Sequence, residues 1–191
     1  MQLYYVAGGD TGIDLSDSLP RVNRCSHCGR ILNKQDVFDL KSAKFSSRWD
    51  LSESRDGFQV ASEKFVRVCR EGGFGNLEFH PIGKSFYVVE CTRMVRFDVK
   101  RSHVRFENLC PACGQYESVV GPLPAPLLLD RNVGPRDFVW TDLHFSTLDE
   151  QGPLLIAGES AVSALRSAKL KRLYFLPEVH YELGGSSAES C

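Results

Sequence analysis

The sequence predicts an α+β fold of mostly antiparallel strands with two equivalent helices, built as two similar halves that meet at four cysteines. Short runs of alternating apolar and polar residues, such as Met94 to Lys100, are typical of half-buried strands. Two segments have the apolar spacing of short helices, and two CxxCG turns stand far apart in the chain. With 191 residues, 42% hydrophobic and 25% charged, the chain is long enough for a single domain over 1–191.

The first half combines one cysteine turn with one helix. Apolar residues from Val60 to Cys69 lie near one helical face, and Gly72-Gly73 is a natural end for that helix. The expected elements, in chain order, are a strand at Leu3 to Val6, a cysteine turn at 24–29, weak strand character at Val37 to Leu40, a helix at Ser62 to Arg70, and a strand from Asn76 to Phe79 that ends at Pro81.

Two alternating runs follow, Phe86 to Glu90 and Met94 to Lys100, and we expect them to form an antiparallel pair. In the second run the apolar residues Val95, Phe97 and Val99 face one side, and the charged residues between them face the other. The remaining expected elements are a cysteine turn at 110–114, a strand at Tyr116 to Val120, a proline-rich loop at 122–126, a strand at Phe138 to Leu143, a helix at Ser160 to Ser167, and a strand at Arg172 to Leu176.

A constant offset of 96 residues relates Val60 to Pro81 with Ile156 to Pro177. Seven of the 22 positions are identical, namely Ala61, Glu63, Val66, Arg70, Leu77, Phe79 and Pro81 with Ala157, Glu159, Val162, Arg166, Leu173, Phe175 and Pro177. Each copy follows a Trp and, further upstream, a CxxCG turn. Chance and duplication both remain open. Duplication gives half-repeats 23–82 and 108–178, with 85–107 as a β-ribbon insertion.

Cys25, Cys28, Cys110 and Cys113 predict one zinc site of the zinc-ribbon type. Zn²⁺ takes four ligands in a tetrahedron, and two CxxC turns can direct four thiolates at one ion. A glycine after the second cysteine suits the left-handed backbone of such a turn, and Gly29 and Gly114 supply it. Four thiolates leave no position for water or substrate, so we expect a structural zinc.

Other roles for the cysteines and for the neighbouring histidine stay open. The two pairs can be unrelated reduced thiols, and His27 within the first turn can replace a ligand. A thioredoxin-like redox role requires a βαβ context that neither pair has. Of the remaining cysteines, Cys69 and Cys91 are expected in the core, and Cys191 is expected to be an exposed terminal thiol.

The sequence predicts a protein that is not an enzyme. It has no GxSxG, Walker loop or HExxH, and the zinc-deaminase signature lacks its upstream His-x-Glu. The formal net charge of −1, which a four-thiolate zinc site would lower by about 2 more, gives no general attraction for nucleic acid. A basic ribbon is the best nucleic-acid candidate, but a simple solvated face is favoured, with Phe97 and Phe106 expected on its buried side; its residues are Arg93, Arg96, Lys100, Arg101 and Arg105.

We expect a cytoplasmic location. The first residues lack the basic and apolar regions of a secretory signal, and no apolar window approaches the ~20 residues that span a membrane. Seven cysteines, an odd number with four in CxxC pairs, favour metal binding over disulfides.

Two CxxCG motifs, each ahead of a helix–strand–proline unit, resemble the double-CXXCG motif family of bacterial proteins, which occurs as paralogous sets in myxobacteria and their relatives. The segment from Ala61 to Pro81 is also similar to that family's helix-to-strand region, and the likeness extends from Cys25 to about Pro177. Some members are regarded as immunity proteins. The resemblance therefore implies a cytosolic protein that binds and neutralises a cognate toxin, such as a nuclease or a deaminase.

Toxins that attack nucleic acids are often basic, so acidic loops are the candidate contacts. Two such loops occupy the same place in each half, between the Trp and the helix; their residues are Asp50, Glu53 and Asp56, and Asp142, Asp149 and Glu150. The alternative is that these loops are simply solvated. The alternative functions are a zinc-ribbon adaptor and a nucleic-acid-binding module.

Overall fold

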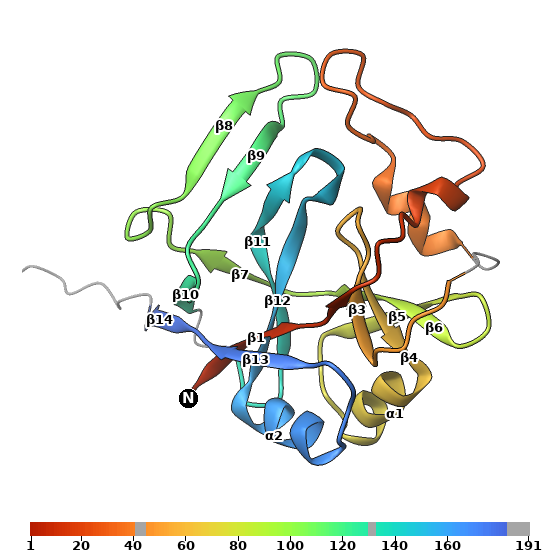
Figure 1. Cartoon of the computed structure of the whole chain (residues 1–191). Coiled ribbons are helices and arrows are strands. Elements are labelled where there is room, and N and C mark those ends of the chain that lie inside the picture. Colours follow the sequence, from red (N-terminus) through yellow and green to blue (C-terminus); the bar gives the residue numbers. More distant parts are fainter. Residues whose placement is uncertain (41–44, 130–132, 183–191) are drawn as a thin grey trace, which may run out of the picture.

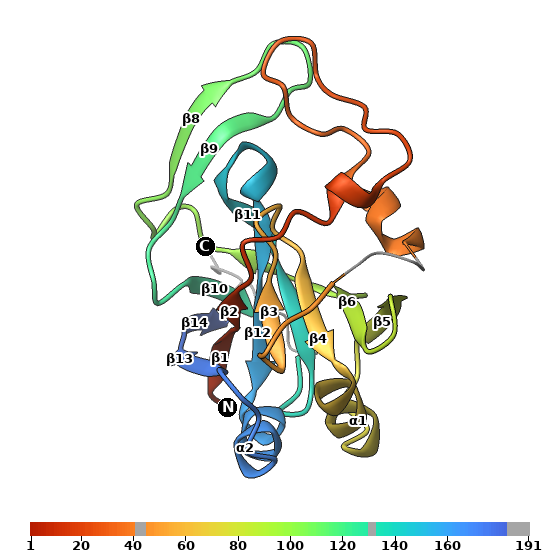
Figure 2. The ribbon, with the colours of Figure 1, turned by 45° about the vertical axis from the view of Figure 1, so that its right-hand side comes forward.

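The structure is a computed structural model and describes residues 1–40, 45–129 and 133–182. Two sheets pack against each other, and two helices, α1 (Glu63–Glu71) and α2 (Glu159–Ser167), lie side by side at one end (Figures 1 and 2). The predicted α+β class, with mostly antiparallel strands and two helices, is confirmed. None of the helices in these residues is long and apolar enough to cross a membrane.

The larger sheet has nine strands among the described residues, in the order β13-β1-β12-β11-β7-β10-β14, with β9 paired to β11 and β8 to β9. Its members are β1 (Leu3–Ala7), β7 (Met94–Phe97), β8 (Arg105–Leu109), β9 (Tyr116–Val120), β10 (Pro126–Leu129), β11 (Phe138–Thr147), β12 (Gly152–Gly158), β13 (Tyr174–Pro177) and β14 (Val179–Glu182).

The smaller sheet has the order β2-β3-β4-β6-β5. Its members are β2 (Gly9–Asp10), β3 (Leu51–Glu53), β4 (Gln59–Ser62), β5 (Leu77–Ile82) and β6 (Phe86–Cys91). Three short 3₁₀ helices complete the elements, η1 (Ser16–Ser18), η2 (Lys34–Asp39) and η3 (Leu148–Glu150).

Both halves contain the same strand–helix–strand arrangement. β4 leads directly into α1, and the chain returns in β5 with β6 between the two strands, antiparallel to both. β12 leads directly into α2, and the chain returns in β13 with β1 in the central place, again antiparallel to both. The central strand therefore follows its helix in the first half and comes from the start of the chain in the second.

The strand registers also agree between the halves. Tyr87 in β6 pairs with Ala61 and Pro81, and its counterpart Tyr4 in β1 pairs with the residues 96 positions further on, Ala157 and Pro177. An arginine near the end of each helix covers this tyrosine: the guanidinium of Arg70 lies 5.9 Å from the Tyr87 ring, and that of Arg166 lies 5.4 Å from the Tyr4 ring. The offset found in the sequence thus relates equivalent places in the two strand–helix–strand units.

The central core lies between the two sheets and the helices. It buries apolar residues from both helices and from both sheets, including Phe65, Leu165, Val89 and Phe138. Ser62, directly before α1, accepts a hydrogen bond from the Phe65 amide with its side chain and caps the helix. A second core lies around β7, β10 and the buried Leu3, and a third packs the η1–η2 segment on the smaller sheet.

Two predictions about Phe86 to Phe106 are wrong. β6 and β7 do not pair: β6 lies between β4 and β5, whereas β7 joins β11 and β10 in the other sheet. β6 pairs with β5 because the turn at Gly83, with φ +61°, connects them as a hairpin. Phe106 is 37% exposed on β8 rather than buried, while Phe97 is buried as predicted.

Other local predictions also differ from the structure. Val37 to Leu40 lies in and next to the 3₁₀ helix η2 rather than in a strand. Pro81 does not end its strand, because β5 is the outer strand of its sheet and an outer strand tolerates a residue without an amide hydrogen. Alternation does not predict several strands, because their apolar pattern is too short or too continuous; these are β3, β4, β8, β10, β12 and β14.

Candidate metal centre

The two cysteine turns adopt the same backbone conformation. In the first, the Cys25 carbonyl accepts the Gly29 amide at 2.9 Å, and the Cys25 amide donates to Arg30. In the second, the Cys110 carbonyl accepts the Gly114 amide at 2.9 Å. Gly29 and Gly114 have φ of +76° and +70°, the left-handed region that glycine adopts without strain. The glycine in each motif therefore closes the turn, as predicted.

The turns meet at one end of the molecule, where the loop before η2 reaches the tip of the β8–β9 ribbon (Figures 1 and 2). The Sγ atoms of Cys25 and Cys110 are 3.7 Å apart, and those of Cys28 and Cys113 are also 3.7 Å apart. All four Sγ atoms lie within 4.8 Å of one another. The structure thus brings together the four predicted ligands.

These distances fit a tetrahedral metal ion. Zn–S bonds of about 2.3 Å in a tetrahedron place sulfur atoms about 3.8 Å apart, close to the separation seen in both pairs. Cys25 and Cys110 are buried and their partners half-buried, so a bound ion would be shielded from solvent on one side. The four thiols can therefore hold one ion, and the donor set is the one that Zn²⁺ prefers in structural sites.

Backbone amides prepare the first cysteine of each turn for metal binding. Hydrogen bonds from the Cys28 and His27 amides lower the pKa of Cys25 to about 6. The Cys113 amide, with a second contribution from Ala112, lowers the pKa of Cys110. At Cys28 the Arg30 amide lowers the pKa, but burial and the three neighbouring thiols together raise it to about 11. A divalent cation would favour the thiolate at all four positions.

The remaining cysteines do not join the cluster where the structure describes them. Cys69 and Cys91 are buried in the central core, as predicted, and burial raises the pKa of Cys69 to about 12 and that of Cys91 further. His27 is exposed and is not among the clustered ligands. Cys191 lies outside the described residues.

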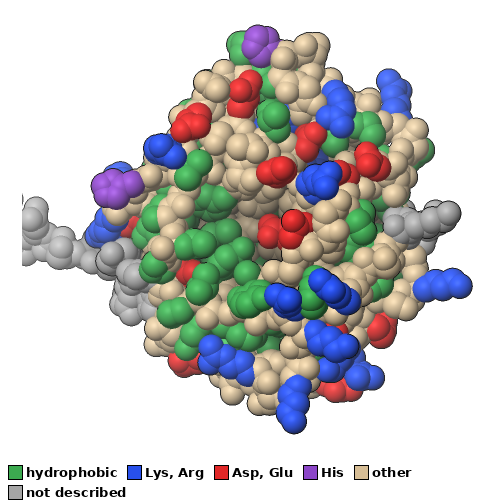
Figure 3. Space-filling view, viewed as in Figure 1, with side chains coloured by type: hydrophobic (Ala, Val, Ile, Leu, Met, Phe, Trp, Pro, Cys, Tyr) green, Lys and Arg blue, Asp and Glu red, His purple; other side chains and the backbone are tan. Residues whose placement is uncertain are grey.

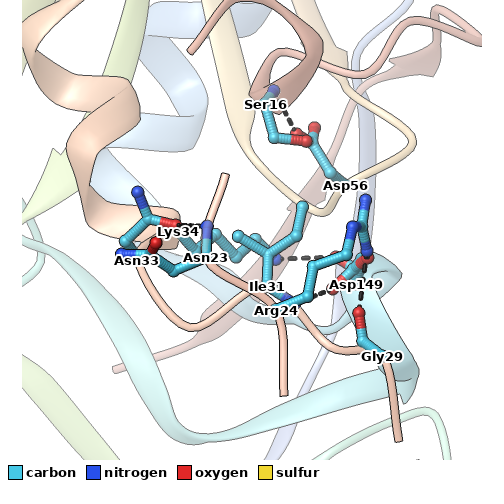
Figure 4. Close-up of polar contacts among 9 residues, drawn as sticks. All are labelled: Ser16, Asn23, Arg24, Gly29, Ile31, Asn33, Lys34, Asp56 and Asp149. Atoms are coloured by element: carbon cyan, nitrogen blue, oxygen red, sulfur yellow. Dashed lines mark hydrogen bonds and ion pairs between the residues drawn. The ribbon is translucent and has the colours of Figure 1, made fainter. Parts of the chain in front are cut away.

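A network of hydrogen bonds ties the metal centre to the β11–β12 turn. Asp149 accepts the Ile31 amide at 2.7 Å and forms a 2.9 Å ion pair with Arg24, which also donates to the Gly29 carbonyl (Figure 4). The Lys34 ammonium, half-buried beside them, donates to the Asp149 carbonyl, and burial lowers its pKa to about 8. The first cysteine turn is thereby fixed to the second half of the chain.

Gln151 is the buried centre of this network. Its amide nitrogen donates to carbonyls of Tyr116, Glu117 and Ser146, and its oxygen accepts from Arg30 at 2.8 Å. The sequence offered no signal for Gln151, because a single glutamine in a turn has no spacing to interpret.

The six predicted partner-binding residues occupy different environments. Asp50 and Asp56 are buried and accept hydrogen bonds within the fold: Asp50 from Ser62 and the Lys171 amide, and Asp56 from the Ser16 amide (Figure 4). Asp142 is exposed on β11 and accepts the Phe97 amide. The other three, Glu53, Asp149 and Glu150, lie close together.

Glu53 and Glu150 line one cleft of about 390 Å³, to which each half of the chain contributes. Asp10 and Arg55, which is ion-paired with Asp14, add further charged groups to its lining, and Tyr5, Phe145 and Leu154 add apolar ones. Arg55 and Glu150 also line a neighbouring hollow of about 240 Å³ with Asp14 and Asp149. Figure 3 shows acidic side chains gathered around the middle of this face, next to an apolar patch.

The two turns that carry these acids pack closely. A Cβ atom at Gly57, in the β3–β4 turn, would lie 2.6 Å from the Glu150 carbonyl oxygen in the β11–β12 turn. Burial, reinforced by Asp10, raises the pKa of Glu53, and burial, reinforced by Asp56, raises that of Asp14. Both shifts come first from burial and second from a neighbouring carboxylate, so removal from water and like charge both disfavour the ionised form of these acids.

Compared with protein-family models and with curated proteins, the chain matches none of them. The residues of the site therefore carry the functional argument.

Proposed function

We propose that this protein is an immunity protein, which binds a cognate antibacterial toxin in the producer's cytoplasm and neutralises it by occlusion rather than by catalysis. The observation that supports this most strongly is the cleft shared by Glu53 and Glu150, because it gathers acidic residues from both halves on a single concave surface. A basic toxin would find there both an attractive charge and an apolar wall.

The charge of the cleft favours a cationic partner segment. Among the residues that the structure describes, five carboxylates line the cleft and its neighbouring hollow, and Arg55 is the one basic residue in the two linings; the acids are Asp10, Asp14, Glu53, Asp149 and Glu150. A partner lysine or arginine would lower the raised pKa values of Glu53 and Asp14. Complementary charge of this kind speeds association and selects the partner.

The ion at the four cysteines is, in this proposal, one structural Zn²⁺. Its part is to hold the loop before η2 and the β8–β9 tip in place, so that Arg24 and Lys34 position the turn that carries Asp149 and Glu150. With four thiolate ligands the ion would offer no position to a substrate. Zinc would therefore shape the binding surface without touching the partner.

We further propose that the two halves arose by duplication. The shared strand–helix–strand order, the matching tyrosine registers and the equivalent arginine–tyrosine contacts support this origin. In this proposal β6 is the counterpart of β1, and not part of an insertion.

One observation favours an alternative, a zinc-ribbon adaptor or nucleic-acid-binding module. The β8–β9 ribbon extends beyond the core, and the exposed rings of Phe106 and Tyr116 lie 5.0 Å apart on it, with the exposed Arg105 next to Phe106. Exposed aromatic and basic side chains can bind a protein strand or stack on bases.

The test is co-expression with the product of a neighbouring toxin gene. We expect a stoichiometric complex on size-exclusion chromatography, one equivalent of zinc, and survival of cells that make both proteins. Asp10→Lys/Glu150→Lys, at exposed cleft positions, should weaken the complex. Glu71→Lys/Glu159→Lys, with the same change in charge but on the helices, should not.

Unchanged binding by the cleft variant would reject the cleft as the contact. Absence of any complex, together with salt-dependent binding of RNA or DNA that Phe106→Ala removes, would replace the proposal with the nucleic-acid alternative.

A further inference from the structure

A second group of metal-ligating side chains lies on the β5–β6 hairpin, within the first strand–helix–strand unit and apart from the four cysteines. Glu78, His80 and Glu90 place one ligand atom each within 4.8 Å of the others. Glu78 and His80 are two residues apart on β5 and share a face, and Glu90 is the direct cross-strand partner of Glu78. Three potential ligands thus converge from two adjacent strands.

The arrangement has an electrostatic cost without a cation. Like charges at directly opposite positions of an antiparallel pair destabilise a sheet, and Glu78 and Glu90 occupy such positions. His80 Nε2 lies 2.7 Å from a Glu90 carboxylate oxygen, so this pair can offset one of the charges when the ring is protonated. Among the described residues no ion pair involves Glu78. A divalent cation would neutralise both carboxylates at once.

Packing holds the imidazole in position. The ring of Phe38, from η2, lies 4.8 Å from the His80 ring, and Phe38 itself packs on Phe58. Glu90 and His80 are half-buried, whereas Glu78 is exposed. Packing and the contact with Glu90 thus fix the imidazole, and Glu78 supplies the third ligand atom from the solvent side.

The donor set identifies the class of ion. One imidazole and two carboxylates suit first-row divalent metals such as Zn²⁺ and Mn²⁺, and not the soft ions that thiolates select. Three protein ligands leave at least one coordination position open. Because β5 is the outer strand of its sheet, that position would be accessible to water or to a ligand from another molecule.

We propose that Glu78, His80 and Glu90 form a second binding site for a divalent first-row metal ion, open to solvent and independent of the zinc held by the four cysteines. The site is independent of the proposed immunity function, and its test involves no toxin.

The test is a titration of untagged protein that already holds one zinc, in a Cys191→Ser background so that the terminal thiol supplies no ligand. Calorimetry with Zn²⁺ should show one further, weaker equivalent. Mn²⁺, which binds oxygen and nitrogen ligands and does not displace Zn²⁺ from thiolates, should broaden the NMR signals of the His80 ring selectively among the histidines.

His80→Asn, Glu90→Gln and Glu78→Gln should each weaken the second equivalent at least about 10-fold, the lower limit of what losing even an outer-shell partner costs. Glu71→Gln, an exposed glutamate on α1, is the matched control and should bind as the wild type does. An unchanged circular dichroism spectrum reports that each variant is folded, and the exposed Glu78→Gln provides a test even where His80→Asn lowers stability.

No second equivalent in the wild-type protein would overturn the proposal. So would a second equivalent that all three variants retain, or one that Glu71→Gln loses, because the ion would then bind elsewhere.

Discussion

Asp50 provides a test of which predicted contact residues are structural. Asp50 is 8% exposed, and its carboxylate accepts two hydrogen bonds, one from the Ser62 hydroxyl and one from the Lys171 amide, both at 2.7 Å. Ser62 caps α1, and Lys171 follows α2. Asp50 therefore connects the start of the first helix to the loop after the second.

Asp50→Ala removes both bonds to a charged acceptor, each of which contributes about 1.5–3 kcal/mol. Water can reach the exposed Lys171, so the lower end of the sum applies, and we expect a loss of about 3 kcal/mol in the free energy of unfolding. Asp50→Asn keeps one acceptor and should lose about half as much.

Urea denaturation followed by circular dichroism measures this loss, with Asp17→Ala, at an exposed position in η1, as the control that stays within about 0.5 kcal/mol of wild type. A loss below about 0.5 kcal/mol in Asp50→Ala would refute the reasoning. Binding of the proposed toxin partner, measured under conditions where Asp50→Ala remains folded, should be unaffected, unlike binding by the cleft variant.

Three further predictions concern the metal centre, a buried acid and a close turn. Cys110→Ser, or chelation, should remove the proposed zinc ion and increase hydrogen exchange in the β8–β9 tip, while α1 and α2 stay protected because their core lies elsewhere. Equal exchange throughout the chain would contradict this. Burial raises the pKa of Glu178 from 4.5 to about 7, so the folded protein retains a proton that the unfolded chain loses, and stability should fall as pH rises from about 4.5 to 7. Glu178→Gln should flatten that slope in denaturation curves, and an unchanged slope would assign it to other groups. Gly57→Ala should lower the melting temperature more than Gly29→Ala. Both glycines have φ +76°, but only at Gly57 would the new Cβ contact backbone, namely the Glu150 carbonyl. Equal losses of melting temperature would show that φ alone matters.

The sequence alone predicted the features that depend on a few neighbouring residues, namely the cysteine turns and the helices. The spacing of Cys25 with Cys28 and of Cys110 with Cys113 identified all four clustered thiols, because a CxxC turn places both sulfurs itself. The helices were predicted within a residue or two, since a buried face and an end are encoded in nine consecutive residues.

The strand partners were not predictable in the same way. Alternation identified β6 and β7 as strands, but it carries no information about the neighbour, and the two belong to different sheets. The Glu78–His80–Glu90 group depends on the register of β5 and β6, and the cleft depends on contact between two turns about 90 residues apart. Such features arise from tertiary packing and leave no periodic pattern.

The placement of β1 determines the order in which the chain can fold during translation. The strands and helix of the first unit, Leu51 to Cys91, are contiguous, so that unit can close as soon as it leaves the ribosome. β1 precedes the other described strands, yet both of its partners, β12 and β13, lie more than 140 residues further along the chain. Between Ala7 and Pro177 the ribosome adds 170 residues (177 − 7), which takes roughly 10–30 s at known translation rates. For that interval Leu3 and Val6, which are buried in the folded protein, belong to a strand whose two partner strands have not yet been made.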